Sequence, residues 1–346
     1  MTIQTSEILF RKPQEVSAVA TNGGRMSFNL YANATAANVF GNVFSAVRAS
    51  GNLAAPDYRK VCVVVANDNE EALYAAMLRL FMPNRGDDWI TFHMGSARDR
   101  QADITGTETR YGNGALHSAV TAGGATLIVD LKSADLASGA DVIARPGDPI
   151  FITDKATWNA TSGNIEQHII DTVTASGSQL TITLDGTTLA NNYAAWNSET
   201  RTGGHIMTAP AAVDVAPALD NYTHTFASTG AIDTAQIVVD SIGSAEMTVS
   251  GVFTDATHFT CTSDDTTHTL GSGVVGTAFA PINPANSKPY LTLPAGALTG
   301  TFTTGDVFSF QVLPPALYPW LRRDIPPACG SLSGDQFVLV QQGESA

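Results

Sequence analysis

The sequence predicts an all-β protein: a discontinuous β-sandwich base domain with an inserted β-sandwich or barrel-like region. Short apolar runs alternate with Gly, Pro, Asn and Asp along most of the 346 residues, as strands separated by tight turns do. Thr and Val dominate many of these runs, and branched side chains favour the pleated backbone. Residues 131–316 hold 17 Asp and Glu against five Lys and Arg, a net charge of −12 out of −14 for the chain. This acidic stretch marks an insertion between two flanking segments.

The flanking segments, residues 1–130 and 317–346, are expected to form the base domain together. Each of them alone has too few strands to bury both faces of a sandwich, so we expect one shared core. The candidate strands are apolar runs bounded by turn residues: 58–65, 73–83, 89–93, 319–324 and 335–340.

The parts of the base domain outside these strands are expected to be less regular. Residues 1–25 are polar and rich in Gly and Asn, and they predict an N-terminal arm that becomes ordered on a neighbouring subunit. Apolar residues at helical spacing predict one short amphipathic helix within residues 26–50. Residues 95–120 are polar and predict a long loop. The residues at helical spacing are Val39, Phe40, Val43, Phe44 and Val47.

The insertion divides into two blocks at an Ala- and Pro-rich link, residues 208–221. We expect a β subdomain over residues 131–207 and an Ig-like β-sandwich over residues 208–316. The candidate strands of the first block are 146–154, 168–174 and 179–185, with a hairpin turn at 175–178. Those of the second block are 235–240, 246–250, 258–262, 290–293 and 307–312.

The sequence lacks the local signatures of common enzymes and metal sites. The seven histidines show no H-x-x-x-H spacing, no Ser occupies a G-x-S-x-G motif, and no glycine-rich phosphate loop precedes a helix. The three cysteines stand far apart without C-x-x-C spacing. We therefore expect no catalytic residues, no cofactor and no metal. The enzymatic alternative is a glycosidase-like pair of distant carboxylates, which leaves no local motif.

Three short motifs are better explained as turns than as sites. Residues 67–71 resemble the start of a calcium loop but lack the Gly and the bidentate Glu that such a loop needs. Asp264 and Asp265, flanked by His258 and His268, are expected to form a polar loop. The tripeptide at 85–87 spells Arg-Gly-Asp, and it is expected to form a turn between two strands.

The charge distribution limits the possible partners. A net charge of −14 leaves no uniformly basic face, so we expect neither sequence-specific nucleic-acid binding nor membrane insertion. The first residues lack a secretory signal pattern, and no apolar run approaches the ~20 residues of a membrane span. We expect synthesis and assembly in a reducing cytoplasm.

Candidate contact residues come from the arm and from aromatic side chains in polar, loop-like surroundings. These aromatic residues are expected to be exposed and to serve a subunit interface or another contact. The candidates are Phe10, Arg11 and Lys12 in the arm and Trp158, Tyr193, Trp196 and Tyr222 in the insertion.

Tyr-Arg-Lys-Val at 58–61, the following run to Ala-Asn-Asp and further strand phrases recur over most of the chain. Together these phrases resemble virion structural proteins of tailed bacteriophages, particularly Mu-like and related long-tailed phages. The resemblance rests on phrases of strand residues and not on a chemical signature. The further phrases lie at 79–81, 83, 86–88, 147–153, 189–193, 279–293, 305–311 and 320–323.

The resemblance implies a virion component that is assembled in the bacterial host cytoplasm. We expect a homo-oligomer in the phage tail, at its tube, tip or baseplate, which holds other phage tail proteins and contacts the host surface. The alternatives are a capsid decoration protein and a carbohydrate-binding or host-receptor-binding β-protein.

Overall fold

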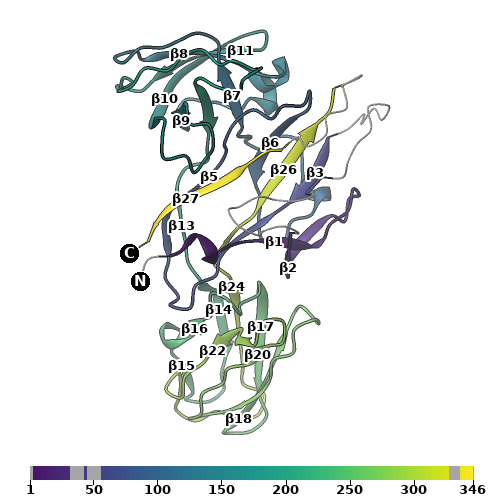
Figure 1. Ribbon diagram of the computed structural model, residues 1–346. Coiled ribbons are helices and arrows are strands. Elements are labelled where there is room, and N and C mark those ends of the chain that lie inside the picture. Colours follow the sequence, from purple (N-terminus) through teal and green to yellow (C-terminus); the bar gives the residue numbers. More distant parts are fainter. Residues whose placement is uncertain (1–2, 32–42, 45–55, 327–335, 346) are drawn as a thin grey trace.

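The computed structural model describes residues 3–31, 43–44, 56–326 and 336–345. Strands dominate this described part, whose helices are five short 3-10 turns, so the all-β prediction is confirmed. Three bodies follow one another along a long axis: a closed barrel, a central base and a distal sandwich (Figure 1). The 3-10 turns are η1 (Thr5–Glu7), η2 (Gln101–Asp103), η3 (Ala134–Ala137), η4 (Gly139–Asp141) and η5 (Thr234–Gln236).

The base combines strands from both ends of the chain in three small sheets, ordered β2-β1-β4-β25, β3-β26-β6 and β13-β5-β27. The C-terminal strands pair with strands from the first hundred residues: β25 with β4, β26 with both β3 and β6, and β27 with β5. The bounds are β1 (Ile8–Glu15), β2 (Gly23–Leu30), β3 (Asp57–Lys60), β4 (Cys62–Val65), β5 (Leu73–Leu80), β6 (Trp89–Met94), β13 (Val213–Val215), β25 (Ala316–Leu317), β26 (Pro319–Asp324) and β27 (Leu339–Ser345).

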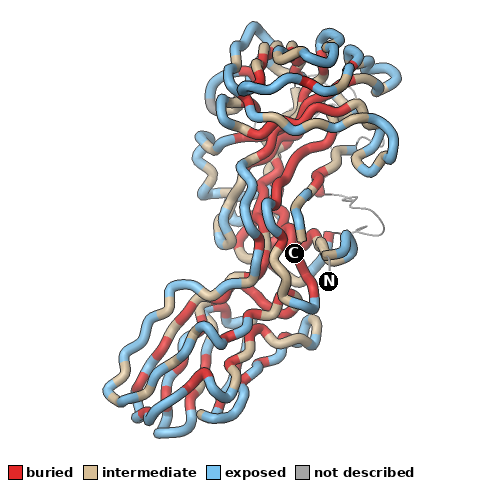
Figure 2. The backbone as a smooth tube through the Cα atoms, turned by 90° about the vertical axis from the view of Figure 1, so that its left-hand side faces the viewer, coloured by how far each residue is buried: buried red, intermediate tan, exposed pale blue. Residues whose placement is uncertain are grey.

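Strands from both ends of the chain share the main hydrophobic core of the base. Val63 of β4 and Phe92 of β6 belong to the same buried cluster as Leu321 of β26 and Leu339 of β27. Burial continues through the interior of the base, while exposed residues follow its outer turns (Figure 2). The two chain ends lie near each other on the surface of the base (Figures 1 and 2).

The N-terminal segment is part of the base. Strand β1 pairs with β2 on one side and β4 on the other, and Phe10 is 3% exposed in the base core. The prediction that residues 1–25 form an arm ordered only by a neighbour is therefore wrong for the strands within it. The predicted helix falls mainly outside the described residues, and the first part of its range, up to Leu30, is strand β2.

The barrel closes in the strand order β10-β11-β8-β7-β12-β9. It begins at Asn113, so the structure differs from the predicted loop over residues 95–120 and from the predicted boundary at residue 130. The sequence pattern does not predict β7, because glycine is uncommon inside strands. Close packing requires Gly114 at this position, since a Cβ there would lie 2.4 Å from the Val129 side chain. The bounds are β7 (Asn113–Leu116), β8 (Thr126–Asp130), β9 (Pro149–Thr153), β10 (Ile165–Ser176), β11 (Gln179–Leu184) and β12 (His205–Thr208).

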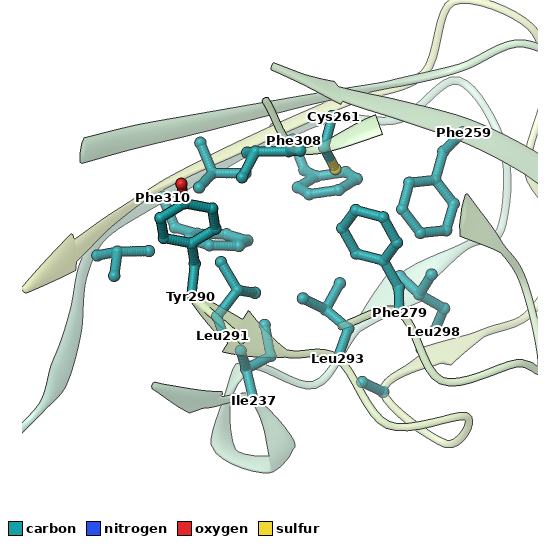
Figure 3. Packing of buried hydrophobic residues seen from close by; sticks show 14 of the residues in the cluster. Ile237, Phe259, Cys261, Phe279, Tyr290, Leu291, Leu293, Leu298, Phe308 and Phe310 are labelled. Carbon is teal, nitrogen blue, oxygen red and sulfur yellow. The ribbon is translucent and has the colours of Figure 1, made fainter. Parts of the chain in front are cut away.

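The sandwich is built on a five-stranded sheet, β14-β24-β17-β18-β19, covered by short strand pairs. Its core is rich in aromatic rings, several of which converge in Figure 3. Phe253 stacks on Phe302 with ring centroids 3.9 Å apart, and Phe259 meets Phe279 edge-on at 5.3 Å. The bounds are β14 (Ala218–Thr225), β15 (Ala231–Ile232), β16 (Val238–Val239), β17 (Met247–Phe253), β18 (His258–Ser263), β19 (Gly271–Val274), β20 (Ile282–Asn283), β21 (Lys288–Pro289), β22 (Leu291–Thr292), β23 (Leu298–Thr299) and β24 (Val307–Leu313).

Candidate functional site

Charged side chains join the sandwich to the base. Glu246, next to β17 and 1% exposed, lies 2.9 Å from Nε of Arg25 and 2.5 Å from Nε of Arg98. The same two arginines reach Asp264, at 2.6 and 2.9 Å. Arg25 lies on β2 and Arg98 follows β6, so two separate base segments converge on the sandwich. We call these four residues, Arg25, Arg98, Glu246 and Asp264, the sandwich joint.

The charges of the sandwich joint compensate one another. Burial raises the pKa of Asp264, but a hydrogen bond from the Thr248 backbone N–H and the charges of Arg25 and Arg98 outweigh burial and lower it below the ordinary value. Removing charges from water costs free energy, which close opposite charges and hydrogen bonds offset. The joint therefore fixes how the two bodies are oriented more than it adds to stability.

Further contacts surround the sandwich joint. Lys288 Nζ of the sandwich donates to Asp68 Oδ1 at 2.6 Å, and the Ser241 backbone N–H donates to Glu70 Oε2 at 2.5 Å. Arg11, which is buried, donates to the Ile242 carbonyl at 3.4 Å. Contacts from several separate parts of the base thus restrain the sandwich.

A second set of contacts joins the barrel to the base. Asp141, in the barrel segment, lies 2.7 Å from Nε of Arg110 and 2.6 Å from Nη1 of Arg322 on β26. His205 on β12 is fully buried and meets Phe81 edge-on, with ring centroids 5.1 Å apart. Burial lowers the pKa of His205 to about 4, so its ring is neutral near pH 7.

The structure places three of the seven candidate contact residues in the interior. Phe10 and Arg11 are buried in the base, and Tyr193 is 1% exposed in the barrel core. The prediction of an exposed position is wrong for Tyr193, which packs in the barrel core. Phe10 and Arg11, predicted to become ordered on a neighbouring subunit, lie instead in β1, which pairs with β2 and β4 of the base. The other four are half-buried: Lys12, Trp158, Trp196 and Tyr222.

Tyr193 belongs to a polar cluster around Glu166 on β10. The Glu166 carboxylate accepts hydrogen bonds from the Tyr193 hydroxyl at 3.0 Å and from the backbone N–H groups of Ala190 and Asn191, each at 2.8 Å. Burial raises the pKa of Glu166, but the bonds from Ala190, Asn191 and Tyr193 lower it to about 2. A carboxylate with so many donors holds the 189–193 segment against the barrel and has little capacity to accept a proton.

Both carboxylates of the acidic pair at 264–265 face the base. Asp264 contacts both arginines of the sandwich joint, and Asp265 lies 3.3 Å from Nη1 of Arg25 and 3.9 Å from Nε2 of His268. His258 pairs with Asp255 instead, at 2.9 Å. Within the described residues there is no group of three or more His, Cys, Asp or Glu side chains placed to hold a metal ion.

The turn at 67–71 is held by one side chain. Asn67 Oδ1 accepts the backbone N–H groups of Asn69 and Glu71, and its Nδ2 donates to the Glu71 carbonyl at 2.9 Å. These bonds form a side-chain-stabilised turn between β4 and β5. Asn67 itself is 1% exposed, so the predicted turn is anchored in the base and is not fully solvated.

A groove of about 350 Å³ runs beside β27. Arg79 of β5, 6% exposed, lies in its wall with the guanidinium 4.2 Å from the centre of the Phe151 ring. Its Nη1 donates to Gln342 Oε1 at 2.6 Å, while Nε has no hydrogen-bond partner in the described part of the chain. The groove is lined by Ile3, Gln4, Thr5, Ile8, Phe10, Leu73, Arg79, Trp158, Val340, Gln341, Gln342 and Gly343.

Comparisons of this chain with protein-family models, with curated proteins and with solved structures found no match. In the described ranges, no helix has the length and apolar character required to cross a membrane.

Of the sandwich joint, the sequence singles out Asp264 alone, and it predicts a polar loop there and not a contact with the base. Arg25 and Glu246 are 221 positions apart, and neither belongs to a recognisable motif. The available signal was weak: Glu246 stands directly before an apolar strand, and Arg25 follows two glycines within a sequence that then alternates. The groove also draws on both chain ends, which no local pattern connects.

Proposed function

We propose that this chain is a structural subunit of a tailed bacteriophage virion, located in the tail, that acts by self-assembly and by holding neighbouring tail proteins. The resemblance of its strand phrases to phage virion proteins supports this assignment. The observation that carries the proposal furthest is the sandwich joint, where Glu246 is buried between Arg25 and Arg98. A subunit of a symmetric assembly must repeat one shape in every copy, and such contacts restrain its shape.

The charge distribution fits the same role. The net charge of −12 over residues 131–316 lies in the segment that forms most of the barrel and the sandwich, at opposite ends of the long axis. Like charges on neighbouring copies oppose unintended contact between these outer bodies. Assembly contacts are then expected on the base, which carries less of the net charge.

Imaging of particles tests the proposal. Virions of a phage that encodes this chain are purified and imaged by electron cryomicroscopy, alongside virions whose copy lacks residues 218–313. We expect density for the intact chain in the tail and the loss of one lobe per copy from the variant. Density on the head would support the decoration alternative, and absence of the chain from purified virions would contradict a structural role.

An activity assay separates the enzymatic alternative. The purified chain is incubated with surface polysaccharide from the host, and released sugar is measured. A structural subunit releases none above the level of a heat-denatured control. Turnover would favour the carbohydrate-degrading class.

A further inference from the structure

One edge of strand β27 has no strand partner among the residues that the structure describes. Strand β27 is the last strand of the sheet β13-β5-β27, and its hydrogen-bonded partner among the described residues is β5. Residues from both faces of β27 line the groove beside it, with Gln342 on one face and Gln341 on the other. A groove lined from both faces of a strand follows the strand's open backbone edge, which is a template for pairing with another strand.

The backbone groups available at this edge follow from the pairing with β5. Val338 accepts the backbone N–H of Phe81 at 2.9 Å, so the backbone groups at 338, 340 and 342 face β5, up to the register shift between Gln342 and Glu344. Those of Leu339, Gln341 and Gly343 therefore face the open side. An antiparallel partner strand can bond to these three positions.

Arg79 extends toward this edge. It pairs across the sheet with Val340 and donates to Gln342 Oε1, so its guanidinium already spans one strand spacing from β5 to β27. Arg79 is only 6% exposed, yet it has no carboxylate partner among the described residues. A buried cation of this kind is stabilised by an incoming carboxylate.

Glu344, on β27 itself, has the charge and the position to be that carboxylate. It is exposed and forms no ion pair within the described part of the chain, and it lies on the same face of β27 as Val340 and Gln342. If two copies pair their β27 strands antiparallel about Gln342, Val340 of one copy stands opposite Glu344 of the other. In this register, Gln341 stands opposite Gly343, and both have outward-facing backbone groups, as an antiparallel ladder requires.

We propose that the open edge of β27 is a docking site for a second copy of this chain, paired antiparallel about Gln342, with Glu344 of each copy meeting Arg79 of the other. The contact is isologous, because the same two residues serve both copies. The inference rests on the proposed structural role and adds to it the surface through which two subunits associate. Charge complementarity between the unpaired Arg79 and the unpaired Glu344 selects a second copy as the occupant.

Disulfide trapping tests the register. At a non-hydrogen-bonded antiparallel pair the two Cα atoms are ~4.5 Å apart, within the range that a disulfide spans. Gln342→Cys is therefore expected to give a disulfide-linked dimer on mild oxidation, seen by non-reducing gel electrophoresis. The control is Ser178→Cys, at the exposed turn between β10 and β11, which is expected to stay monomeric. Equal cross-linking of both variants would overturn the pairing.

Charge variants test the ion pair by sedimentation equilibrium. Glu344→Arg places two cations together and loses the contact twice per dimer, so the dimer dissociation constant is expected to rise at least about tenfold. Glu344 is exposed, so this variant should retain the far-ultraviolet circular dichroism of the parent. Adding Arg79→Met to Glu344→Gln should weaken association no further than Glu344→Gln alone. Unchanged association in Glu344→Arg would overturn the inference.

The outcomes separate the inference from the proposed function. A defined oligomer that is insensitive to Glu344→Arg and does not cross-link through Gln342→Cys contradicts the β27 contact and leaves the structural role in place. A chain that stays monomeric at every concentration also contradicts the β27 contact. The structural role is then decided by the presence or absence of the chain in purified virions.

Discussion

Several ionisable side chains lie in the interior of this protein, each with specific partners. Lys60 is fully buried, and its Nζ donates to Asp99 Oδ1 at 2.6 Å and to the Gly24 carbonyl at 2.8 Å. Its ammonium also lies 5.9 Å from the centre of the Trp320 ring. A buried charge with such partners ties distant segments together, since leaving it unpaired costs several kcal/mol.

His205 makes the stability of the protein depend on pH. Burial lowers its pKa to about 4, whereas an unfolded histidine titrates near 6.5. Below about pH 6.5 the unfolded chain therefore binds a proton that the folded chain does not, and stability falls until about pH 4. The full difference is about 3 kcal/mol for this one residue. We expect the free energy of unfolding in urea to fall less between pH 7 and 4.5 for His205→Leu than for the parent.

Other groups also titrate in this range, so the comparison needs a matched histidine. His224 on β14 is exposed, and His224→Gln should keep the pH dependence of the parent. If His205→Leu and His224→Gln show the same slope, His205 is not the source of the acid sensitivity.

At the scale of elements, apolar runs and alternation in the sequence locate about half of the strands in the described residues. The run 307–312 alternates apolar and polar residues and was predicted as a strand, and β24 is Val307–Leu313. Strand β1 was missed because Arg11 and Lys12 make it look like a polar arm. The structure explains Arg11: its guanidinium lies 4.6 Å from the centre of the Phe28 ring and donates to a sandwich carbonyl. Tertiary contacts of this kind leave no local signal.

The candidate sites were less predictable than the strands. Tyr193 looked exposed because its neighbours in sequence are polar, but those neighbours are occupied with Glu166. The sandwich joint and the β27 groove both assemble residues from distant parts of the chain. Sequence spacing alone does not place such residues together without the fold.

Strand β26 makes the C-terminal segment essential to the base. It lies between β3 and β6, and Trp320 and Leu321 within it are fully buried. Deleting residues 317–346 removes β26 and β27 and exposes the core that they cover. We expect the base to lose its cooperative unfolding transition, measured by circular dichroism and limited proteolysis. A shorter deletion, of residues 344–346, removes only the end of β27 and should keep the unfolding transition. An unchanged transition in the long deletion would show that the two ends of the chain do not share a core.

At the scale of the whole molecule, the chain leaves the base twice and returns to it. The first excursion forms the barrel and the second the sandwich, with β13 pairing with β5 between them. The sequence-based division at residue 208 falls on the last residue of the barrel strand β12, and β7 and β8 extend the barrel before residue 131. Each outer body depends on side-chain contacts to the base for its orientation.

Glu246 is the residue on which the orientation of the sandwich depends most. Glu246→Gln removes the buried negative charge of the joint. Arg98 then keeps one carboxylate partner, Asp264, and Arg25 keeps Asp264 and Asp265. Removing one partner of a buried ion pair costs about 3 kcal/mol, and we expect a loss of this order in the free energy of unfolding in urea. Spin labels on the base and the sandwich should also show a broader distance distribution by pulsed electron resonance.

Asp255→Asn is the matched control, because Asp255 is an exposed carboxylate of the same sandwich that pairs with His258 and not with the base. The same distance distribution in both variants would mean that apolar contacts, and not the ion pairs of the joint, hold the sandwich in place.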